Sequence, residues 1–322
     1  MNEKAAQAPT VVYVSASQYS GSTLASFLLN THSAMATLGH STGWPFGEHE
    51  AFYCSCGELL EQCPFYREIS RSFAENHLPF DIRNFGTEYR LARHDRLNRY
   101  LTASLPAFES SALEKLRDTI VEWIPGVANR LAQQDKANWT LINAALINSG
   151  ASIYVDNSHD PYRLRKLTRI EGLELKNIHL VRDPRGVVLS CMKNANWSAS
   201  LAVHLWQRRQ RDIVRIGAEL SNPSLRIYYE DLCRETDRIL ALIHQFAGAA
   251  PQPFPGSFDS AEHHILGNAM RLRDNQIRFE ERWRRELQAP DLDTVNASLI
   301  RFADSAPEHP VTEIIRHYLS DS

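Results

Sequence analysis

The hydrophobic positions of the chain form four short apolar runs, and each run is followed by residues with helical spacing. The runs cover residues 11–14, 152–155, 177–181 and 225–229. Short runs of this kind, rich in β-branched and aliphatic residues, are typical of strands buried on both faces. Because strands that alternate with helices form parallel sheets, the pattern predicts an α/β fold with a parallel β-sheet flanked by helices.

A long polar stretch separates the first two predicted strands. Apolar residues recur there at helical spacing over residues 87–105 and 110–134. We therefore expect a helical insertion at about residues 65–150, beside the sheet. Segments of this kind often determine which substrate an enzyme accepts.

The first predicted strand leads directly into a turn and a helix, in the stretch VVYVSASQYSGSTLASFLLN. The first N–H groups of such a helix, and the positive end of its dipole, favour an anion. Counted from Ala16, the stretch places Gly21 and Thr23 on the last glycine and last hydroxyl of a G-x-x-x-x-G-K-[ST] loop, but Ser22 replaces the lysine. Without that lysine the loop lacks the group that grips a β/γ-phosphate. The stretch is either a site for a shorter anionic group or an ordinary strand–turn–helix connection with a serine N-cap.

A second candidate site follows the third predicted strand, in NIHLVRDPRGVVLSC. Arg182 comes directly after the strand, at the edge of the sheet where open α/β folds bind ligands. Pro184 suits the first turn of a helix, and Ser190 lies about two turns further on, eight residues after Arg182. Arg182 and Ser190 could together bind a phosphate group. Alternatively, Arg182 forms an ion pair with Asp183 and Ser190 is buried within the helix.

Composition excludes some classes of protein. The 322 residues include 35 basic and 38 acidic residues, for a net charge of −3, so a dedicated nucleic-acid-binding protein is not expected. The arginines of WQRRQRDIVRIGAEL (Arg208, Arg209, Arg211 and Arg215) are interpreted as a solvent-exposed helix face. No apolar run reaches the length of a membrane helix, and residues 1–10 lack the apolar centre of a signal peptide. We expect a cytoplasmic protein without stable membrane insertion, and the sequence leaves its oligomeric state open.

Three of the five cysteines are clustered, as Cys54, Cys56 and Cys63 in CSCGELLEQC. A structural zinc ion would need four nitrogen or sulfur ligands, so His40 or His49 would have to complete the set. Otherwise the segment is a surface turn with reduced thiols, or with a local disulfide. In a cytosolic chain we expect the thiols to be reduced.

The stretches SQYSGSTL, RDPRGVVLS and YYEDL, in this order, resemble the sulfotransferase family that uses 3′-phosphoadenosine 5′-phosphosulfate (PAPS). HHILGNAMR, and CSCGELLEQCPFY following LGH, are similar to the bacterial branch of this family. The resemblance extends in patches over about residues 11–287. It implies a P-loop-like sulfotransferase fold in a single domain over residues 8–322, with the insertion on the acceptor side.

The resemblance also implies which residues bind the donor. The 5′-phosphosulfate would bind the loop and the helix start, the 3′-phosphate would bind an arginine and a serine, and a tyrosine would lie beside the adenine. A late loop would close over the 3′-phosphate. These residues are, in chain order, Ser17, Gln18, Tyr19, Ser20, Gly21, Ser22, Thr23, Leu24, Arg182, Ser190, Tyr229, Gly267, Asn268 and Arg271. PAPS would be the co-substrate and 3′-phosphoadenosine 5′-phosphate (PAP) the product, and no metal would be required.

Two positions depart from the family pattern. Tyr19 stands where members usually have lysine or arginine, and a phenol supplies a hydrogen bond but no positive charge. Arg271, Arg273 or Arg163 could compensate. Leu24 stands where cytosolic members have a tryptophan that stacks on adenine, as is usual in the bacterial branch.

Sulfuryl transfer needs a base that takes the proton of the acceptor hydroxyl, and a histidine suits this role near pH 7. His159, in DNSHDP, resembles the segment that contributes the catalytic histidine in cytosolic sulfotransferases. His40, in LGH, takes the position of a base glutamate in other members, and Glu48 follows closely. We rank His159 above His40.

We expect the acceptor to be a small molecule or a carbohydrate. Aromatic residues of the insertion either line its pocket or form the core of the insertion; they are Phe46, Phe52, Tyr53, Trp123 and Trp139. Two other functions are considered. One is a non-catalytic protein that binds PAPS or PAP, and the other is a nucleotide-dependent phosphotransferase, which would need the missing lysine.

Overall fold

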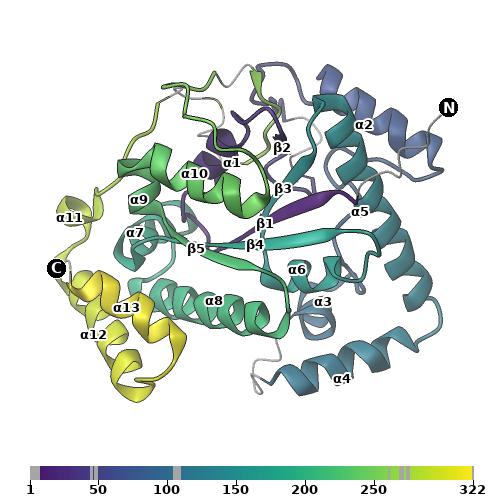
Figure 1. Ribbon diagram of the computed structural model, residues 1–322. Coiled ribbons are helices and arrows are strands. Elements are labelled where there is room, and N and C mark those ends of the chain that lie inside the picture. Colours follow the sequence, from purple (N-terminus) through teal and green to yellow (C-terminus); the bar gives the residue numbers. More distant parts are fainter. Residues whose placement is uncertain are drawn as a thin grey trace.

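The computed structural model is built around a parallel β-sheet with helices on both faces (Figure 1). The structure describes residues 8–43, 46, 50–103, 110–259, 262–267, 272 and 276–320. In these ranges the sheet has five strands in the order β2-β3-β1-β4-β5, and every pair of neighbours is parallel. The strands are β1 (Thr10–Ala16), β2 (Met35–Thr37), β3 (Ile153–His159), β4 (Glu174–Val181) and β5 (Ser224–Tyr228).

The helices form three groups around the sheet: one beside β1 and β5, one in the insertion, and one near the C-terminus (Figure 1). Every helix in the described ranges is too short or too polar to cross a membrane. The helices are α1 (Ser22–Leu29), α2 (Pro64–Glu75), α3 (Asp95–Thr102), α4 (Ser111–Glu122), α5 (Val127–Ser149), α6 (Pro161–Leu167), α7 (Pro184–Ala195), α8 (Ala199–Glu219), α9 (Tyr229–Arg234), α10 (Thr236–Ala247), α11 (Trp283–Glu286), α12 (Ala289–Ser305) and α13 (Pro310–Ser320).

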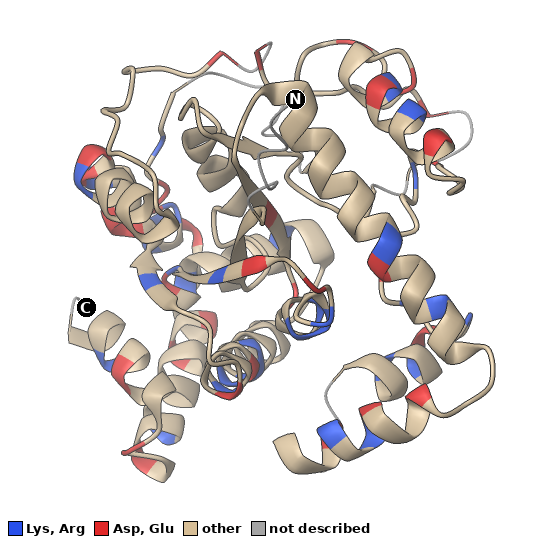
Figure 2. Cartoon of the chain, turned by 45° about the vertical axis from the view of Figure 1, so that its right-hand side comes forward, with Lys and Arg blue, Asp and Glu red and all other residues tan. Residues whose placement is uncertain are grey.

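Strand β1 is buried on both faces, as its continuous apolar sequence requires. Successive side chains of a strand point to opposite faces, so Val12 and Val14 pack with α1 and α10, whereas Val11 and Tyr13 pack with the insertion and α6. Charged side chains lie mainly on the helices and the connecting segments, and the central strands carry few (Figure 2). The predicted parallel α/β fold is therefore confirmed.

The four predicted strands are all present, but the sequence analysis missed β2, which has only three residues. The insertion also differs in detail. The helix predicted over residues 110–134 is two helices, because Pro125 and Gly126 interrupt it and Gly126 has a φ of 83°. The helix predicted over 87–105 begins only at Asp95. Before it, polar side chains hold the backbone of Thr87 in an irregular conformation, and Arg163 and Asn138 both donate to its carbonyl oxygen.

The carboxyl ends of β1 and β4 lie side by side, because Ala16 pairs with Leu180. From β1 the chain continues to β2 at one edge of the sheet, and from β4 it continues to β5 at the other edge. Adjacent strands whose connections leave in opposite directions create a crevice, where open α/β sheets bind ligands. The loop at residues 17–21 and Arg182 both lie at this point.

Candidate active site

The loop after β1 ends at Gly21, the N-cap of α1, which has a φ of 85°. The N–H groups of the first helical turn have no carbonyl partner within the helix and can serve an anion. The ring of Tyr229 lies directly against the loop, because a Cβ atom added to Gly21 would be 2.3 Å from Tyr229 Cδ2. Only glycine fits at this position, for both its backbone angle and its contact.

Arg182 holds the loop from the end of β4. Its Nη1 donates to the carbonyl oxygen of Tyr19 at 2.8 Å, and its Nη2 donates to the carbonyl of Glu280 at 3.3 Å. The guanidinium also lies over the Tyr229 ring, 4.6 Å from its centroid. The loop's own hydroxyls add a second restraint, since Ser17 Oγ and Ser20 Oγ are 2.6 Å apart.

Among the described residues, no carboxylate forms an ion pair with Arg182. The alternative prediction, a pair with Asp183, is wrong: Asp183 caps α7 and pairs with Arg185 at 2.7 Å. The partners of Arg182 are carbonyl oxygens and an aromatic ring, which do not cancel its charge. The positive charge at this edge of the sheet is therefore available to an anion.

Ser190 lies in α7, one turn after Gly186. Its Oγ donates to the carbonyl oxygen of Gly186 at 2.9 Å. Gly186 is next to Arg182, since a Cβ atom added to it would be 3.4 Å from Arg182 Nε. The hydroxyl of Ser190 thus makes a bond within its own helix, and its side chain would have to rotate before it could donate to a ligand.

Tyr229 follows β5 directly and is buried, and its hydroxyl donates to the carbonyl of Arg278 at 3.2 Å. Burial raises the pKa of Tyr229, so the hydroxyl stays protonated.

Leu24 is buried in the core between α1 and the sheet. Gly267 lies against α1, because a Cβ atom added to it would be 3.1 Å from Thr23 Oγ1. Asn268 and Arg271, which the resemblance places in a loop with Gly267, lie outside the described residues, and so does Arg273, considered as a substitute for the missing loop cation.

Strand β3 brings His159 to the same loop. Tyr13 pairs with Asp156 but Ser15 pairs with His159, so β3 has one extra residue here and bulges. His159 has a φ of 63°, unusual for a residue with a side chain. Its Nε2 is 2.7 Å from Ser22 Oγ, at the position of the missing lysine.

The ring of His40 meets that of His159 edge-to-face, with 4.8 Å between centroids. Burial lowers the pKa of His40 to about 4. Burial, followed by the nearby His40 and Arg209, holds the pKa of His159 well below its ordinary value. Both imidazoles are therefore neutral at pH 7, the form in which a histidine accepts a proton. Glu48 and His49 lie outside the described residues.

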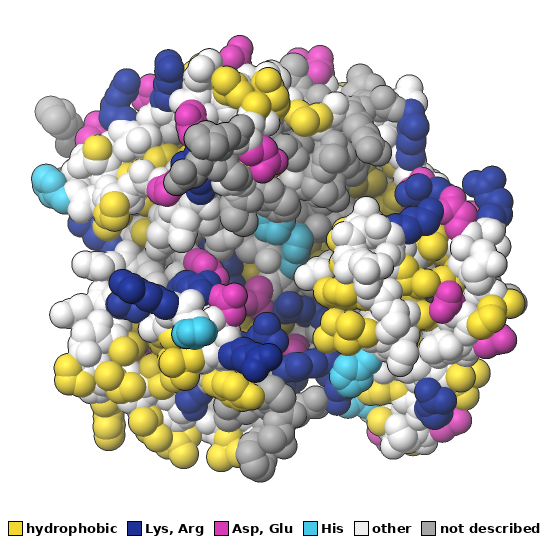
Figure 3. Space-filling model, turned by 180° about the vertical axis from the view of Figure 1, so that it is seen from behind, with side chains coloured by type: hydrophobic (Ala, Val, Ile, Leu, Met, Phe, Trp, Pro, Cys, Tyr) yellow, Lys and Arg dark blue, Asp and Glu magenta, His cyan; other side chains and the backbone are white. Residues whose placement is uncertain are grey.

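A cavity of about 690 Å³ opens beside this loop, between the sheet and helices α3, α6 and α8. Ser17, Gln18 and Ser158 line it on the loop side. Figure 3 shows the hollowed face of the molecule, where basic and acidic side chains gather between two lobes. The charged residues of the cavity are largely paired: Arg209 with Asp160 at 2.9 Å, and Arg90 with Asp95 at 2.5 Å.

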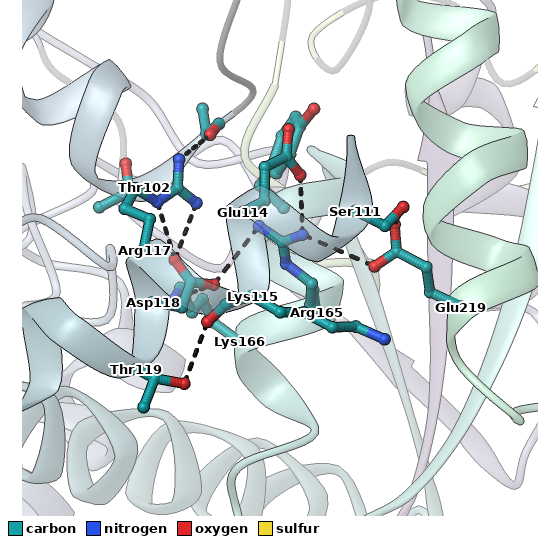
Figure 4. Close-up of polar contacts among 12 residues, drawn as sticks. Thr102, Ser111, Glu114, Lys115, Arg117, Asp118, Thr119, Arg165, Lys166 and Glu219 are labelled. Atoms are coloured by element: carbon teal, nitrogen blue, oxygen red, sulfur yellow. Dashed lines mark hydrogen bonds and ion pairs between the residues drawn. The ribbon is translucent and has the colours of Figure 1, made fainter. Parts of the chain in front are cut away.

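The helix rich in arginine is α8, and the prediction of a solvent-exposed face is wrong for Arg209 and Arg215. Arg209 lines the cavity, and Arg215 is mostly buried in a cluster with Glu114 and Glu219. The cluster also includes Arg165 of α6, whose Nη1 is 2.9 Å from Glu114, and ties the insertion helix α4 to α6 and α8 (Figure 4). Ion pairs thus fix the packing of α6 and α8, and other residues of these two helices line the cavity.

Arg163, proposed from the sequence as a substitute for the missing loop cation, cannot take that role. It is buried and pairs with Asp156 at 3.0 Å, and it also binds Thr87 and Asn138. Its donors are occupied by residues of β3, of α5 and of the segment before α3. Compensation for Tyr19 by Arg163 is therefore ruled out by the geometry.

The aromatic residues considered from the sequence as a lining of the acceptor pocket do not line this cavity. Phe46 stacks on the buried Phe52 at 5.0 Å, and Trp123 is 81% exposed. Within the described ranges the lining includes none of the five residues considered. Four other aromatic residues line the cavity: Tyr89, Tyr162, Trp197 and Trp206.

No protein-family profile matches the chain, and no curated protein sequence matches it. Among solved structures, the sulfotransferase domain from the Synechococcus PCC 7002 olefin synthase is 19% identical, with a TM-score of 0.42, over 92% of this chain and 97% of that domain. The sulfotransferase domain from the curacin biosynthetic pathway is 16% identical, with a TM-score of 0.49, over 90% of this chain and 97% of that domain. Sulfotransferase STF9 from Mycobacterium avium is 14% identical, with a TM-score of 0.39, over 76% and 65% of the two chains. At these scores the likenesses carry no argument about the site, which rests on its own residues.

Proposed function

We propose that the protein is a PAPS-dependent sulfotransferase that acts on a hydroxyl group of a small molecule or a carbohydrate. The observation that carries the proposal is the position of Arg182. It is an arginine without a carboxylate partner in the described structure, and it is bonded to the loop that starts α1. Two anion-binding groups, a helix N-terminus and an unneutralised guanidinium, thus adjoin one aromatic ring.

This pair of sites suits a nucleotide with phosphate groups at two separate positions. The N–H groups of Ser22 and Thr23 would bind the 5′-phosphosulfate, Arg182 and Ser190 would bind the 3′-phosphate, and Tyr229 would lie beside the base. Gly267, Asn268 and Arg271 would close over the 3′-phosphate. The absence of a loop lysine argues against a phosphotransferase that acts on a γ-phosphate.

The reaction would join the acceptor oxygen to sulfur as the bond between sulfur and the bridging phosphate oxygen breaks. The acceptor proton would pass to His159, or to His40, and PAP would leave. His159 is favoured because it contacts the loop through Ser22, and its neighbours Ser158 and Asp160 line the cavity. The N-terminus of α1 would stabilise the charge that develops on the leaving phosphate.

Tyr19 supports a second candidate, a protein that binds PAPS or PAP without turnover. The loop presents a phenol where a cation would neutralise the leaving phosphate. The side chain of Arg163 forms an ion pair with Asp156 and cannot replace this cation. An enzyme with this loop would depend on the helix N-terminus and on Arg182 to stabilise the charge of the leaving phosphate.

Two measurements test the proposal. In a melting assay, PAP at about 100 times its dissociation constant should stabilise the protein by about 2.7 kcal/mol, and ATP at the same concentration by much less. Transfer of labelled sulfate from PAPS to a panel of hydroxyl acceptors then separates an enzyme from a binding protein. Stabilisation without transfer would support the second candidate, and equal stabilisation by ATP and PAP would contradict both.

A further inference from the structure

Three cysteines and one histidine meet at a point that the proposed activity does not use. Cys54, Cys56 and Cys63 come from the segment before α2, and His264 comes from the late segment 262–267. The sulfur atom of Cys63 lies 3.8 Å from those of Cys54 and Cys56. His264 Nδ1 lies 3.2 Å from Cys63 Sγ and 3.7 Å from Cys54 Sγ. All four atoms are within 4.8 Å of one another.

The four distances of 3.2–3.8 Å are close to the edges of a tetrahedron around a metal ion. A tetrahedral zinc ion holds its sulfur ligands about 3.8 Å apart, and a sulfur and a nitrogen about 3.5 Å apart, for bonds of about 2.3 and 2.0 Å. A disulfide needs about 2.05 Å between sulfurs, and all three cysteines are free. We propose that Cys54, Cys56, Cys63 and His264 bind a structural zinc ion, a role that does not depend on the proposed activity.

The choice of metal follows from the ligands. Three thiolates and an imidazole select zinc over magnesium or calcium, which prefer oxygen. Four protein ligands complete a tetrahedral shell and leave no position for a substrate, as in structural zinc sites. The sequence analysis named His40 or His49 as the fourth ligand; His40 instead faces His159, and His49 lies outside the described residues.

The segment that holds the cysteines is a tight hairpin. The N–H of Cys54 donates to the carbonyl of Glu58 at 2.9 Å, and the N–H of Gly57 donates back to the carbonyl of Cys54 at 3.0 Å. Gly57 has a φ of 88°, which closes the turn. Cys63 is the N-cap residue of α2, so the helix start fixes its position. Local backbone structure thus directs all three sulfurs to one side.

Residues between and beside the cysteines orient the histidine. Ser55 Oγ donates to the carbonyl of His263 at 3.0 Å and accepts from the N–H of Ile265 at 2.8 Å. The hydroxyl of Tyr66 donates to the carbonyl of His264 at 2.9 Å, and the ring of Phe65 stacks on the imidazole at 4.6 Å. Contacts of this kind around a metal site orient its ligands.

The site would fasten the late segment to the edge of the sheet. Two residues after His264, the N–H of Leu266 donates to the carbonyl of Leu38 at 2.7 Å, and Gly267 then packs on Thr23 of α1. A metal bound to His264 would therefore stabilise the position of residues 262–267 against the start of α1. Its removal should loosen residues 262–267 first.

The test begins with metal analysis of the purified full-length protein. We expect about one zinc ion per chain in the unaltered protein, and loss of the ion in the variants Cys63→Ser and His264→Ala. Matched controls are Cys191→Ser, a buried cysteine elsewhere, and His263→Ala, the neighbouring histidine that bonds Asn30. Both controls should keep the ion.

A ligand variant that fails to fold would not decide the question, so a second measurement uses the unaltered chain. A mercurial reagent that modifies the thiols should release zinc in step with modification, and cobalt in its place should give a sulfur-to-cobalt charge-transfer band. An unaltered protein that contains no zinc and takes up none would overturn the proposal. So would iron in place of zinc, a disulfide between two of the cysteines, or equal zinc content in His264→Ala and the unaltered protein.

Discussion

Two arginines at the same edge of the sheet differ in what surrounds them. Within the described ranges, the side chain of Arg182, at the end of β4, bonds only to carbonyl oxygens and lies over an aromatic ring. Arg209, which lines the cavity from α8, pairs with Asp160 at 2.9 Å. The charge of Arg182 is therefore available to a ligand, whereas a carboxylate of the protein neutralises the charge of Arg209. The loop side is thus suited to an anion.

The largest effect is expected on the rate of sulfuryl transfer, from a change at His159. Replacing His159 with alanine should lower the rate of sulfuryl transfer by about 10² to 10⁴-fold, because it removes the proton acceptor, while PAP affinity is kept. The comparison variant is His40→Ala, whose ring faces His159. The measurement is initial rate with labelled PAPS, beside calorimetry with PAP. Full activity in both single variants would remove both histidines as the base.

The comparison of the two arginines can be tested directly. Arg182→Met should weaken PAP binding by about 10- to 150-fold, the equivalent of about 1.5–3 kcal/mol for hydrogen bonds to a charged group. Arg209→Met should leave PAP affinity unchanged and alter only the acceptor side. Calorimetry on both variants checks this. Equal losses in the two variants would mean that the arginines do not differ as their surroundings indicate.

A smaller effect concerns the fit of the loop under Tyr229. Gly21→Ala should lower the free energy of unfolding by more than the roughly 1–2 kcal/mol that a left-handed backbone costs an alanine, because the added Cβ would collide with the ring. Gly150→Ala is the matched control: its φ is 69°, and a Cβ there meets nothing within 4 Å. Urea unfolding measures both. The same loss at the two positions would show that Tyr229 does not press on the loop.

A further effect depends on pH. Burial lowers the pKa of His40, His159, His179 and His244 in the folded protein. Below the ordinary pKa of about 6.5 the unfolded chain binds protons that the folded one does not, so stability should be constant above pH 7 and fall as the pH drops from 6.5 toward 4. The slope is at most about 1.4 kcal/mol per pH unit for each histidine. Melting curves from pH 8 to 5 check this, and a higher melting temperature at pH 5 would contradict it.

The parts of the candidate site that could be predicted from the sequence are those in which neighbouring residues act together. The loop around Gly21 follows an apolar strand and precedes a helical pattern, so its place in the fold follows from local sequence. Arg182 could be placed for the same reason, between a strand and Pro184. The fold class also follows from the order of apolar runs, and β2 was missed because three residues give no periodicity.

Contacts between distant segments could not be predicted. His264 lies 201 residues from Cys63, and no spacing rule connects them. Arg209 pairs with Asp160 at the start of α6, and Arg215 pairs with Glu114 of α4. These ion pairs depend on how α4 and α6 pack against α8. The sequence of α8 alone therefore suggested a solvent-exposed face. The hydrogen bond between Ser22 and His159 depends on a bulge in β3, which the sequence of that strand does not reveal.

The most direct measurement of the central claim is calorimetry of the unaltered protein with two nucleotides, PAP and adenosine 5′-monophosphate, which lacks the 3′-phosphate. If the start of α1 and Arg182 hold the two ends of one nucleotide, PAP should bind, and loss of the 3′-phosphate should weaken binding by at least about tenfold. Equal affinity for the two nucleotides, or no heat with PAP, would contradict the claim.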